Sequence, residues 1–122
     1  MRVIAGTCRG LPLRAPRGRE VRPTSDRLRG AVFSSLGPRV VGARVWDVCA
    51  GTGAVGIEAL SRGAALAVFS ETSRAALEAL RANLAATRLS DRAQVLAVAW
   101  EQALDRLAAS VERFDLVYFD PP

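Results

Sequence analysis

Residues 45–56 read Val45-Trp46-Asp47-Val48-Cys49-Ala50-Gly51-Thr52-Gly53-Ala54-Val55-Gly56, an apolar run that passes into three glycines. The run is typical of a buried β-strand, and the glycines fit the spacing G-x-G-x-x-G of a tight turn between a strand and a helix. Glycines at such a turn let the backbone approach a ligand closely. By itself the motif is a weak signal, because dinucleotide-binding folds share it.

Strands and helices are expected to alternate around this turn. Apolar runs predict strands at 45–48, 66–70, 94–98 and 115–119, and helical periodicity predicts helices at 54–61, 73–86 and 101–109. Such alternation indicates a parallel sheet with right-handed crossovers. We therefore expect an α/β fold with a Rossmann-like sheet, in which Trp46 belongs to the core. A doubly wound sheet normally continues for more strands, so the last strand is expected to lack a covering helix.

The first 43 residues differ in character. Short apolar stretches broken by glycines over residues 1–21 predict a small β-hairpin or arm. A helix is expected to start after Ser25 and to end at Gly37-Pro38, with apolar residues at helical spacing between them. We expect residues 1–43 to form a basic arm and helix, and residues 44–122 to form the nucleotide-binding domain.

Charge is distributed unevenly along the chain. All 17 basic residues are Arg, and residues 1–44 hold ten of them against two acids, whereas residues 45–122 hold seven against ten acids. A GC-rich genome would explain the absence of Lys but not this one-sided excess. The asymmetry favours a polyanion such as RNA as the partner of the N-terminal part. The candidate RNA-binding residues are Arg9, Arg14, Arg17, Arg19, Arg22 and Arg27.

The amino-acid composition limits the catalytic groups and metal ligands that the chain can supply. The chain of 122 residues is one domain at most, and it has no His, which removes the commonest general base and metal ligand. Its two Cys lie in different contexts and form no metal-ligand spacing, so no zinc site or disulfide is expected. No apolar run approaches the roughly 18 residues of a membrane span, and we expect a cytoplasmic protein without a metal. Glu58 and Glu78 are expected to be solvated surface charges.

Two acids at strand ends narrow the choice of cofactor. Asp47 stands four residues before Gly51, where dinucleotide-binding folds usually have an apolar residue. A carboxylate there suits a cofactor that carries an ammonium and a sulfonium, such as S-adenosylmethionine. Glu71 ends the next strand, where an acid can accept hydrogen bonds from ribose hydroxyls in either type of cofactor. The choice between the cofactors therefore rests on Asp47.

The last strand ends in Asp120-Pro121-Pro122, which predicts the substrate half of a site. Proline offers no N–H and cannot continue a ladder, so a carboxylate and proline carbonyls would be held in the crevice beyond the strand. The lone pair of an exocyclic amine on a base is delocalised into the ring. Acceptors for its two N–H bonds would orient the nitrogen and favour the charge that develops on it. The alternative is a proline-stopped strand followed by a loop.

These motifs resemble class I S-adenosylmethionine-dependent N-methyltransferases, and further stretches resemble the bacterial 16S ribosomal RNA guanine-N2 methyltransferases, the RsmD family. The more specific stretches are Met1-Arg2-Val3-Ile4-Ala5-Gly6, Arg22-Pro23-Thr24-Ser25-Asp26-Arg27-Leu28-Arg29 and Gly56-Ile57-Glu58-Ala59-Leu60-Ser61-Arg62-Gly63-Ala64. The resemblance covers essentially the whole chain. It implies methylation of the N2 of one guanine in 16S ribosomal RNA, or in the assembling small subunit, by a monomer that releases S-adenosylhomocysteine.

The resemblance also implies roles for individual residues. Asp120, Pro121 and Pro122 would form the catalytic motif, and residues 22–29 would border the active site on the RNA side. The cofactor-binding residues expected are Asp47, Ala50, Gly51, Thr52, Gly53, Glu71, Thr72, Ala99 and Trp100.

The chain departs from the family pattern in several places. Cys49 and Thr52 are mild changes, whereas Ala99 stands where the family has an acid that contacts the adenine amine. Glu101 would substitute for that acid if the third strand ended a turn later. The family also has an aromatic residue and further strands after the two prolines, so we expect an N-terminal fragment. Two other functions stay open at this point, a non-catalytic RNA-binding remnant and a dinucleotide-dependent oxidoreductase.

Overall fold

The computed structural model describes residues 1–16, 25–110 and 112–122. All the strands and helices predicted from residue 25 onward are present, with small shifts at their ends. The elements in chain order are α1 (Asp26–Leu36), the 3-10 helix η1 (Gly37–Val40), β1 (Arg44–Asp47), α2 (Ala54–Ser61), β2 (Leu66–Ser70), α3 (Arg74–Thr87), the 3-10 helix η2 (Ser90–Arg92), β3 (Ala93–Leu96), α4 (Trp100–Ala109) and β4 (Leu116–Tyr118).

The four strands form one parallel sheet in the order β3-β2-β1-β4. The chain builds outward from β1 through β2 to β3, and then crosses back to place β4 on the other side of β1. The strand order therefore reverses between β1 and β4. In open α/β sheets a reversal of this kind opens a crevice at the carboxyl ends of the strands, where ligands bind.

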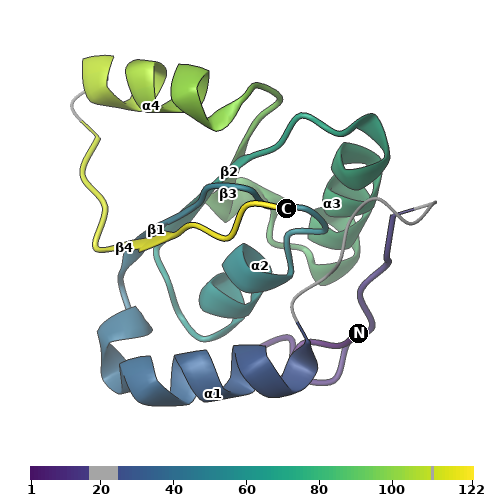
Figure 1. Cartoon of the computed structure of the whole chain (residues 1–122). Coiled ribbons are helices and arrows are strands. Elements are labelled where there is room, and N and C mark those ends of the chain that lie inside the picture. The colour runs from purple at the N-terminus through teal and green to yellow at the C-terminus, as the bar shows by residue number, and fades with distance from the viewer. Residues whose placement is uncertain (17–24, 111) are drawn as a thin grey trace.

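Alternate residues of each strand face opposite layers of helices. Val45 and Phe69 belong to a core cluster shared with α1, α2 and α3, whereas Trp46 and Val68 belong to a second cluster beneath α4. Figure 1 shows α4 on one side of the sheet and α1 and α2 on the other. The expectation that Trp46 is a core residue is confirmed, since it is 7% exposed and its indole N–H donates to Ser70 Oγ at 3.0 Å.

Residues 1–16 fold back on themselves and pack onto the body of the domain. Val3 N–H donates to the Leu11 carbonyl at 3.0 Å, and Leu13 N–H donates to the Met1 carbonyl at 2.9 Å, beside an isolated antiparallel bridge between Arg2 and Pro12. Val3 and Leu13 are buried in the cluster that contains α2 and α3. The first residues thus form a hairpin-like turn anchored in the main core.

The expectation that Glu58 is a solvated surface charge is wrong. Its side chain is fully buried and accepts hydrogen bonds from the backbone N–H groups of Ile4 (2.9 Å) and Ala5 (3.0 Å). It also pairs with Arg29 at 3.3 Å and with Arg62 at 2.8 Å. Helical spacing indicates the pair with Arg62, four residues later, but not the burial, because the other partners lie on the N-terminal segment and on α1. Glu58 therefore fastens the N-terminal segment to α2.

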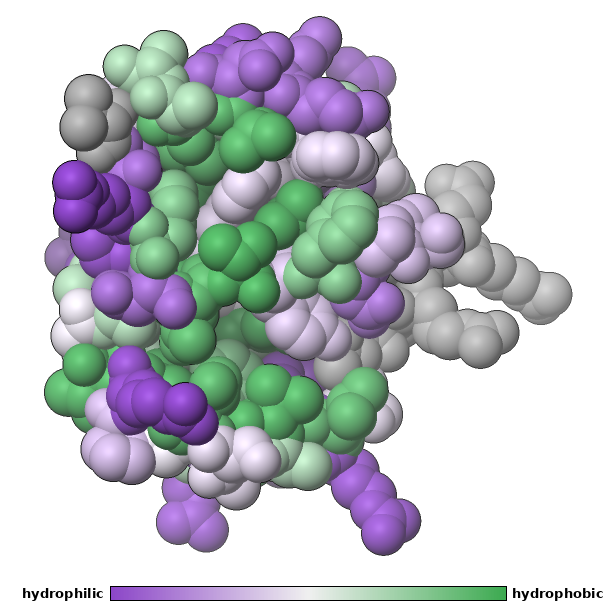
Figure 2. Space-filling model, turned by 60° about the vertical axis from the view of Figure 1, so that its left-hand side comes forward, coloured by the Kyte–Doolittle hydropathy of each residue, from purple (hydrophilic) through white to green (hydrophobic). Residues whose placement is uncertain are grey.

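The edge strand β4 carries exposed apolar side chains. Val117 is 57% exposed and Phe119 just beyond the strand is 53% exposed, and Leu104 of α4 is also exposed. Figure 2 shows apolar surface gathered on this side of the molecule, between the polar outer surfaces of the helical layers. The carboxyl ends of β1 and β4 lie at the crevice described next.

Candidate functional site

A cavity of about 760 Å³ lies at the carboxyl ends of the strands, where the strand order reverses. The loops that follow all four strands contribute to its walls. Of the site residues predicted from the sequence, the following line it: Asp47, Ala50, Gly51, Thr52, Glu71, Thr72, Ala99, Trp100, Asp120, Pro121 and Pro122. The fold therefore brings the predicted cofactor and substrate motifs to one place.

Asp47 ends β1 at the floor of this cavity. It is 2% exposed, and its Oδ2 accepts the backbone N–H of Gly56 in the first turn of α2 at 3.1 Å. Burial raises the pKa of Asp47 to about 7, against the effect of the Gly56 hydrogen bond, and the negative charges of Glu71 and Asp120 add to the rise. Asp47 is thus poised to lose its proton when a cation enters the cavity.

Glu71 follows β2 and is held by backbone donors. Its Oε1 accepts the Gly51 N–H at 2.7 Å, and its Oε2 accepts the N–H groups of Thr72 and Ser73, each at 2.8 Å. A carboxylate has about four acceptor positions, so Oε1 keeps capacity for one more donor. This arrangement fixes the carboxylate between the loop after β1 and the start of α3.

Gly53 does not line the cavity, although the sequence predicts it as a cofactor contact. It has φ of 82°, and a Cβ at this position would lie 2.2 Å from Leu80 Cδ1. A Cβ on Gly56 would lie 2.3 Å from the Phe69 ring. These two glycines allow α2 to pack tightly against α3 and β2, so the spacing of the motif reflects helix packing at least as much as ligand approach.

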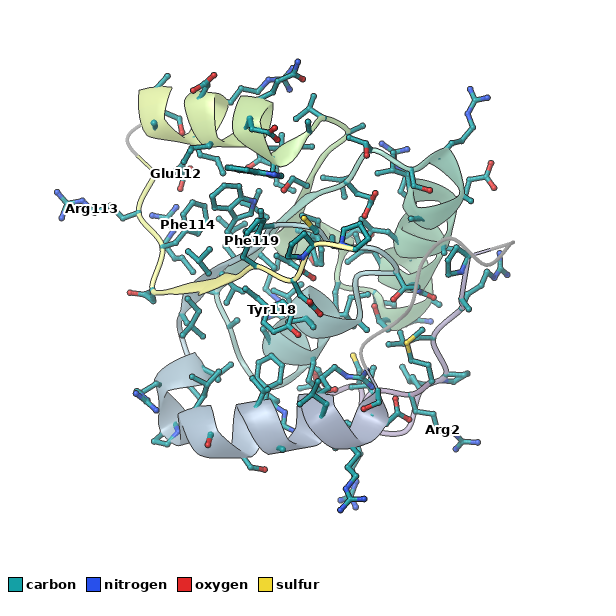
Figure 3. The ribbon with its side chains drawn as sticks, viewed as in Figure 1. Arg2, Glu112, Arg113, Phe114, Tyr118 and Phe119 are labelled. Atoms are coloured by element: carbon teal, nitrogen blue, oxygen red, sulfur yellow. The ribbon has the colours of Figure 1, made fainter. Side chains whose placement is uncertain are left out.

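The Asp-Pro-Pro motif reaches the cavity because β4 pairs with β1. Asp47 lies opposite Tyr118 in the register, and Asp120 follows two residues later on the cavity wall. Figure 3 shows Tyr118 and Phe119 pointing to opposite sides of the chain. Phe119 makes an edge-on contact with Trp100 of α4, with ring centroids 5.4 Å apart. This aromatic pair fixes the start of α4 against the chain that leads into the motif.

Glu101 does not line the cavity, because β3 ends too early to place it there. The strand ends at Leu96, earlier than predicted, and Glu101 lies exposed in the first turn of α4 outside the cavity lining. Ala99 occupies the lining as the residue that precedes α4, without a side-chain capping bond. The substitution of Glu101 for an acid at residue 99 is therefore not supported by its position.

Sequence reasoning missed several lining residues, of which Ser70 and Tyr118 are the most informative. Ser70 Oγ accepts from Trp46 and donates to the Val48 carbonyl, so it holds the two neighbours of Asp47 in the chain. A polar residue that ends an apolar strand was an available signal for Ser70. No comparable signal marked Tyr118, whose position depends on the pairing of β4 with β1.

The thiol of Cys49 lies on the cavity wall and has no feature of a nucleophile. Burial raises the pKa of Cys49, and the carboxylates of Glu71, Asp47, Asp120 and Glu101 raise it further. The described part of the chain contains no group of His, Cys, Asp or Glu side chains that could hold a metal ion.

The predicted RNA-binding arginines are only partly described. Arg9, Arg14 and Arg27 are exposed, whereas Arg17, Arg19 and Arg22 lie outside the described residues. Arg29, which belongs to the stretch expected to border the RNA side, is buried and pairs with Glu58 and Asp26. None of the helices in the described ranges is long and apolar enough to cross a membrane.

Comparisons with known proteins identify the family of the chain. A family model described as "Conserved hypothetical protein 95" matches residues 1–122. The chain is 38% identical over 122 residues to the ribosomal RNA small subunit methyltransferase D of Escherichia coli, and covers 60% of that protein. It is also 38% identical over 122 residues to YlbH of Bacillus subtilis, a candidate rRNA methyltransferase, and covers 66% of it.

A solved structure agrees with these matches. The candidate methyltransferase yhhF of Escherichia coli superposes with a TM-score of 0.83 at 34% identity, and the match covers all of this chain and 64% of that one. The chain therefore spans less than two thirds of the length of these relatives. Its fold is the Rossmann-like fold of class I methyltransferases, and the chain belongs to the family described as Conserved hypothetical protein 95, which is that of the small-subunit ribosomal RNA methyltransferase D proteins.

Proposed function

We propose that this protein transfers a methyl group from S-adenosylmethionine to the exocyclic N2 of a guanine in 16S ribosomal RNA. The observation that carries the proposal is the meeting of three carboxylates, those of Asp47, Glu71 and Asp120, on one cavity, whose lining within the described residues contains no basic side chain. Such a cavity favours a ligand that brings positive charge. The names of the relatives with 38% identity support the same reaction.

The donor groups near the turn argue for S-adenosylmethionine over a dinucleotide. A diphosphate needs free backbone N–H groups at the start of the helix that follows the first strand. Here the Gly56 N–H at the start of α2 donates to Asp47, and the Gly51 N–H donates to Glu71. At these two amides a diphosphate would meet a carboxylate in place of a free donor, whereas an ammonium or sulfonium would be stabilised by the same carboxylates.

The residues of the cavity fit this cofactor. Asp47 would ionise and pair with its positive charge, and the remaining acceptor position on Glu71 Oε1 would take a ribose hydroxyl. Ala50, Gly51, Thr52, Thr72, Ala99 and Trp100 would complete the walls around it. When bound, S-adenosylmethionine supplies an electrophilic methyl group on its sulfonium, and S-adenosylhomocysteine is the product.

The Asp120-Pro121-Pro122 motif would hold the guanine. The Asp120 carboxylate and the Pro121 carbonyl are acceptors for the two N–H bonds of the exocyclic amine, and Pro122 restricts the chain that carries them. Holding both N–H bonds orients the nitrogen lone pair and stabilises the positive charge that develops on nitrogen. Asp120 is then placed to take the proton that the nitrogen releases.

The N-terminal part would bind the RNA. Its ten arginines give residues 1–44 an excess of positive charge, and Arg9, Arg14 and Arg27 are exposed among the described ones. Phosphate groups are the partners that such a surface attracts. We place the reaction in the cytoplasm, on 16S RNA or the assembling small subunit, and expect a monomer.

An assay of methyl transfer from radiolabelled S-adenosylmethionine to 16S RNA tests the proposal. The assay uses the natural gene product as it is made in the cell. The label should appear in N2-methylguanosine, and Asp120→Ala should lower kcat far more than RNA affinity. Label in another nucleoside, or full turnover by Asp120→Ala, would contradict the assignment. RNA binding without any transfer would favour the non-catalytic alternative.

A further inference from the structure

The side chain of Asn83 joins two segments that lie far apart in the sequence. It is 2% exposed in the middle of α3. Its Oδ1 accepts the Arg14 N–H at 2.6 Å, and its Nδ2 donates to the Arg14 carbonyl and to the Thr52 carbonyl, each at 3.0 Å. One buried amide therefore binds both the N-terminal segment and the loop of residues 50–53.

The requirement for Asn at this position follows from its partners. A backbone N–H can only donate and the two carbonyls can only accept, so the amide has a single orientation that satisfies all three. An Asp would accept from Arg14 but could not donate to either carbonyl. A Leu of similar size would leave three backbone groups without this partner, and the Thr52 carbonyl among them is buried.

The loop that Asn83 reaches is part of the cavity wall. Thr52 is 3% exposed and lines the cavity, and the Gly53 N–H closes the loop onto the Ala50 carbonyl at 2.8 Å. A second contact links the same loop to the N-terminal segment, from Thr52 Oγ1 to Met1 Sδ at 3.9 Å. Loop 50–53 is therefore joined to residues 1–16 both directly, through Met1, and through the side chain of Asn83.

We propose that Asn83 is a positioning residue that sets the conformation of loop 50–53 and couples it to the N-terminal segment. A ligand that orders the loop would then order the backbone at Arg14, and a polyanion bound to the N-terminal segment would in turn raise the affinity of the cavity for its ligand. The second effect rests on the proposed function, whereas the positioning of the loop does not.

The test compares Asn83→Ala with a matched control, Ser61→Ala. Ser61 is also buried and also anchors the N-terminal segment by two side-chain hydrogen bonds, since its Oγ accepts the Cys8 N–H at 3.0 Å and donates to the Ala5 carbonyl at 2.6 Å. Both variants should lose thermal stability. Only Asn83→Ala removes a bond to loop 50–53.

Hydrogen exchange of the Gly51 and Gly53 amides measures the order of the loop without any ligand. Asn83→Ala should accelerate exchange at these amides by about fivefold or more, and Ser61→Ala, which reaches the loop only through the N-terminal segment, should accelerate it less. Asn83→Asp keeps the acceptor for the Arg14 N–H and loses both donors, so it should accelerate exchange as Asn83→Ala does. It replaces Asn83→Ala in the experiment if the alanine variant does not fold. Unchanged exchange in the Asn83 variants, or equal acceleration in Ser61→Ala, would overturn the proposal.

Titration with S-adenosylhomocysteine then separates this proposal from the proposed function. Asn83→Ala should weaken binding by about fivefold or more relative to Ser61→Ala. If neither the wild type nor the variants bind the ligand, the cofactor assignment fails, and the hydrogen-exchange result still decides the role of Asn83.

Discussion

Asp47 and Tyr118 lie opposite each other at the carboxyl ends of two parallel strands, β1 and β4. Because β4 enters on the side of β1 away from β2, the loops that leave these strands diverge and open the cavity between them. The same pairing carries Asp120 to the cavity, where its charge contributes to the raised pKa of Asp47.

Unfolding measured against pH tests the state of Asp47. Its pKa in the folded protein is about 7, above its ordinary value of 3.8, so between these values the folded state keeps a proton that the unfolded state has lost. Stability without ligand should therefore fall as pH rises through this window. The fall should be on the order of a few kcal/mol, since a displacement of one pKa unit is worth about 1.4 kcal/mol.

Asp47→Asn is the matched control, because it stays neutral and keeps an oxygen to accept the Gly56 N–H. The variant should gain stability relative to the wild type on going from pH 5 to pH 8, as measured by urea unfolding. Parallel stability curves for the two proteins would show that Asp47 is ionised throughout.

Ala99→Asp should raise both stability and cofactor affinity. Residue 99 is the N-cap of α4 and has no side-chain capping bond, and an acid there gains roughly 0.5–2 kcal/mol of capping energy. It also lines the cavity, where it adds an acceptor for the adenine amine. Ala99→Ser caps the helix without adding a carboxylate, so it should raise the Tm and leave the cofactor affinity unchanged. Equal affinity for S-adenosylhomocysteine in the two variants would refute the adenine contact.

Glu58→Gln should destabilise the protein by about 3–5 kcal/mol, the usual cost of breaking a buried ion pair. The change removes the charge that Arg29 and Arg62 face in the interior. Glu78→Gln on the exposed face of α3 is the control and should change stability by less than about 0.5 kcal/mol. Chemical denaturation measures the free energy of unfolding of both variants. If Glu58→Gln loses no more stability than Glu78→Gln, the buried ion pairs of Glu58 contribute little.

Charge reversal should map the RNA surface. Changing the exposed Arg9, Arg14 and Arg27 to Glu should weaken RNA binding and flatten the plot of log K against log salt, because each lost phosphate contact removes about 0.7–0.9 from the slope. The control reverses three exposed arginines of the remaining chain, Arg88, Arg106 and Arg113. Equal loss from both sets would mean that RNA binding follows net charge and has no preferred face.

The sequence predicted the elements well because hydrophobic periodicity reports directly on the sheet and its helices. The predicted bounds of α2 and β2 coincide with those observed, since glycines and buried strand residues mark their ends. The sequence also predicted that Asp47, Glu71 and Asp120 share a site, because the carboxyl ends of parallel strands meet at one edge.

What the sequence did not reveal are contacts between distant segments. Glu58 has the spacing of a helix-surface acid, and its burial depends on Ile4 and Ala5 folding back over α2. Asn83 likewise has no local signature, because its partners belong to the N-terminal segment and to the loop after β1. The packing of Leu80 of α3 against Gly53 has no local signature either, because it joins two elements that are distant in the sequence.

Calorimetric titration at pH 8 tests whether Asp47 selects a cationic cofactor. S-adenosylhomocysteine and NAD are added separately to the wild type and to Asp47→Asn. At this pH Asp47 has lost its proton. We expect S-adenosylhomocysteine to bind the wild type, and Asp47→Asn to bind it about tenfold more weakly or worse, a loss of about 1.4 kcal/mol. NAD should give no binding heat. Binding of NAD in place of S-adenosylhomocysteine, or equal affinity of the two proteins for S-adenosylhomocysteine, would contradict this role of Asp47.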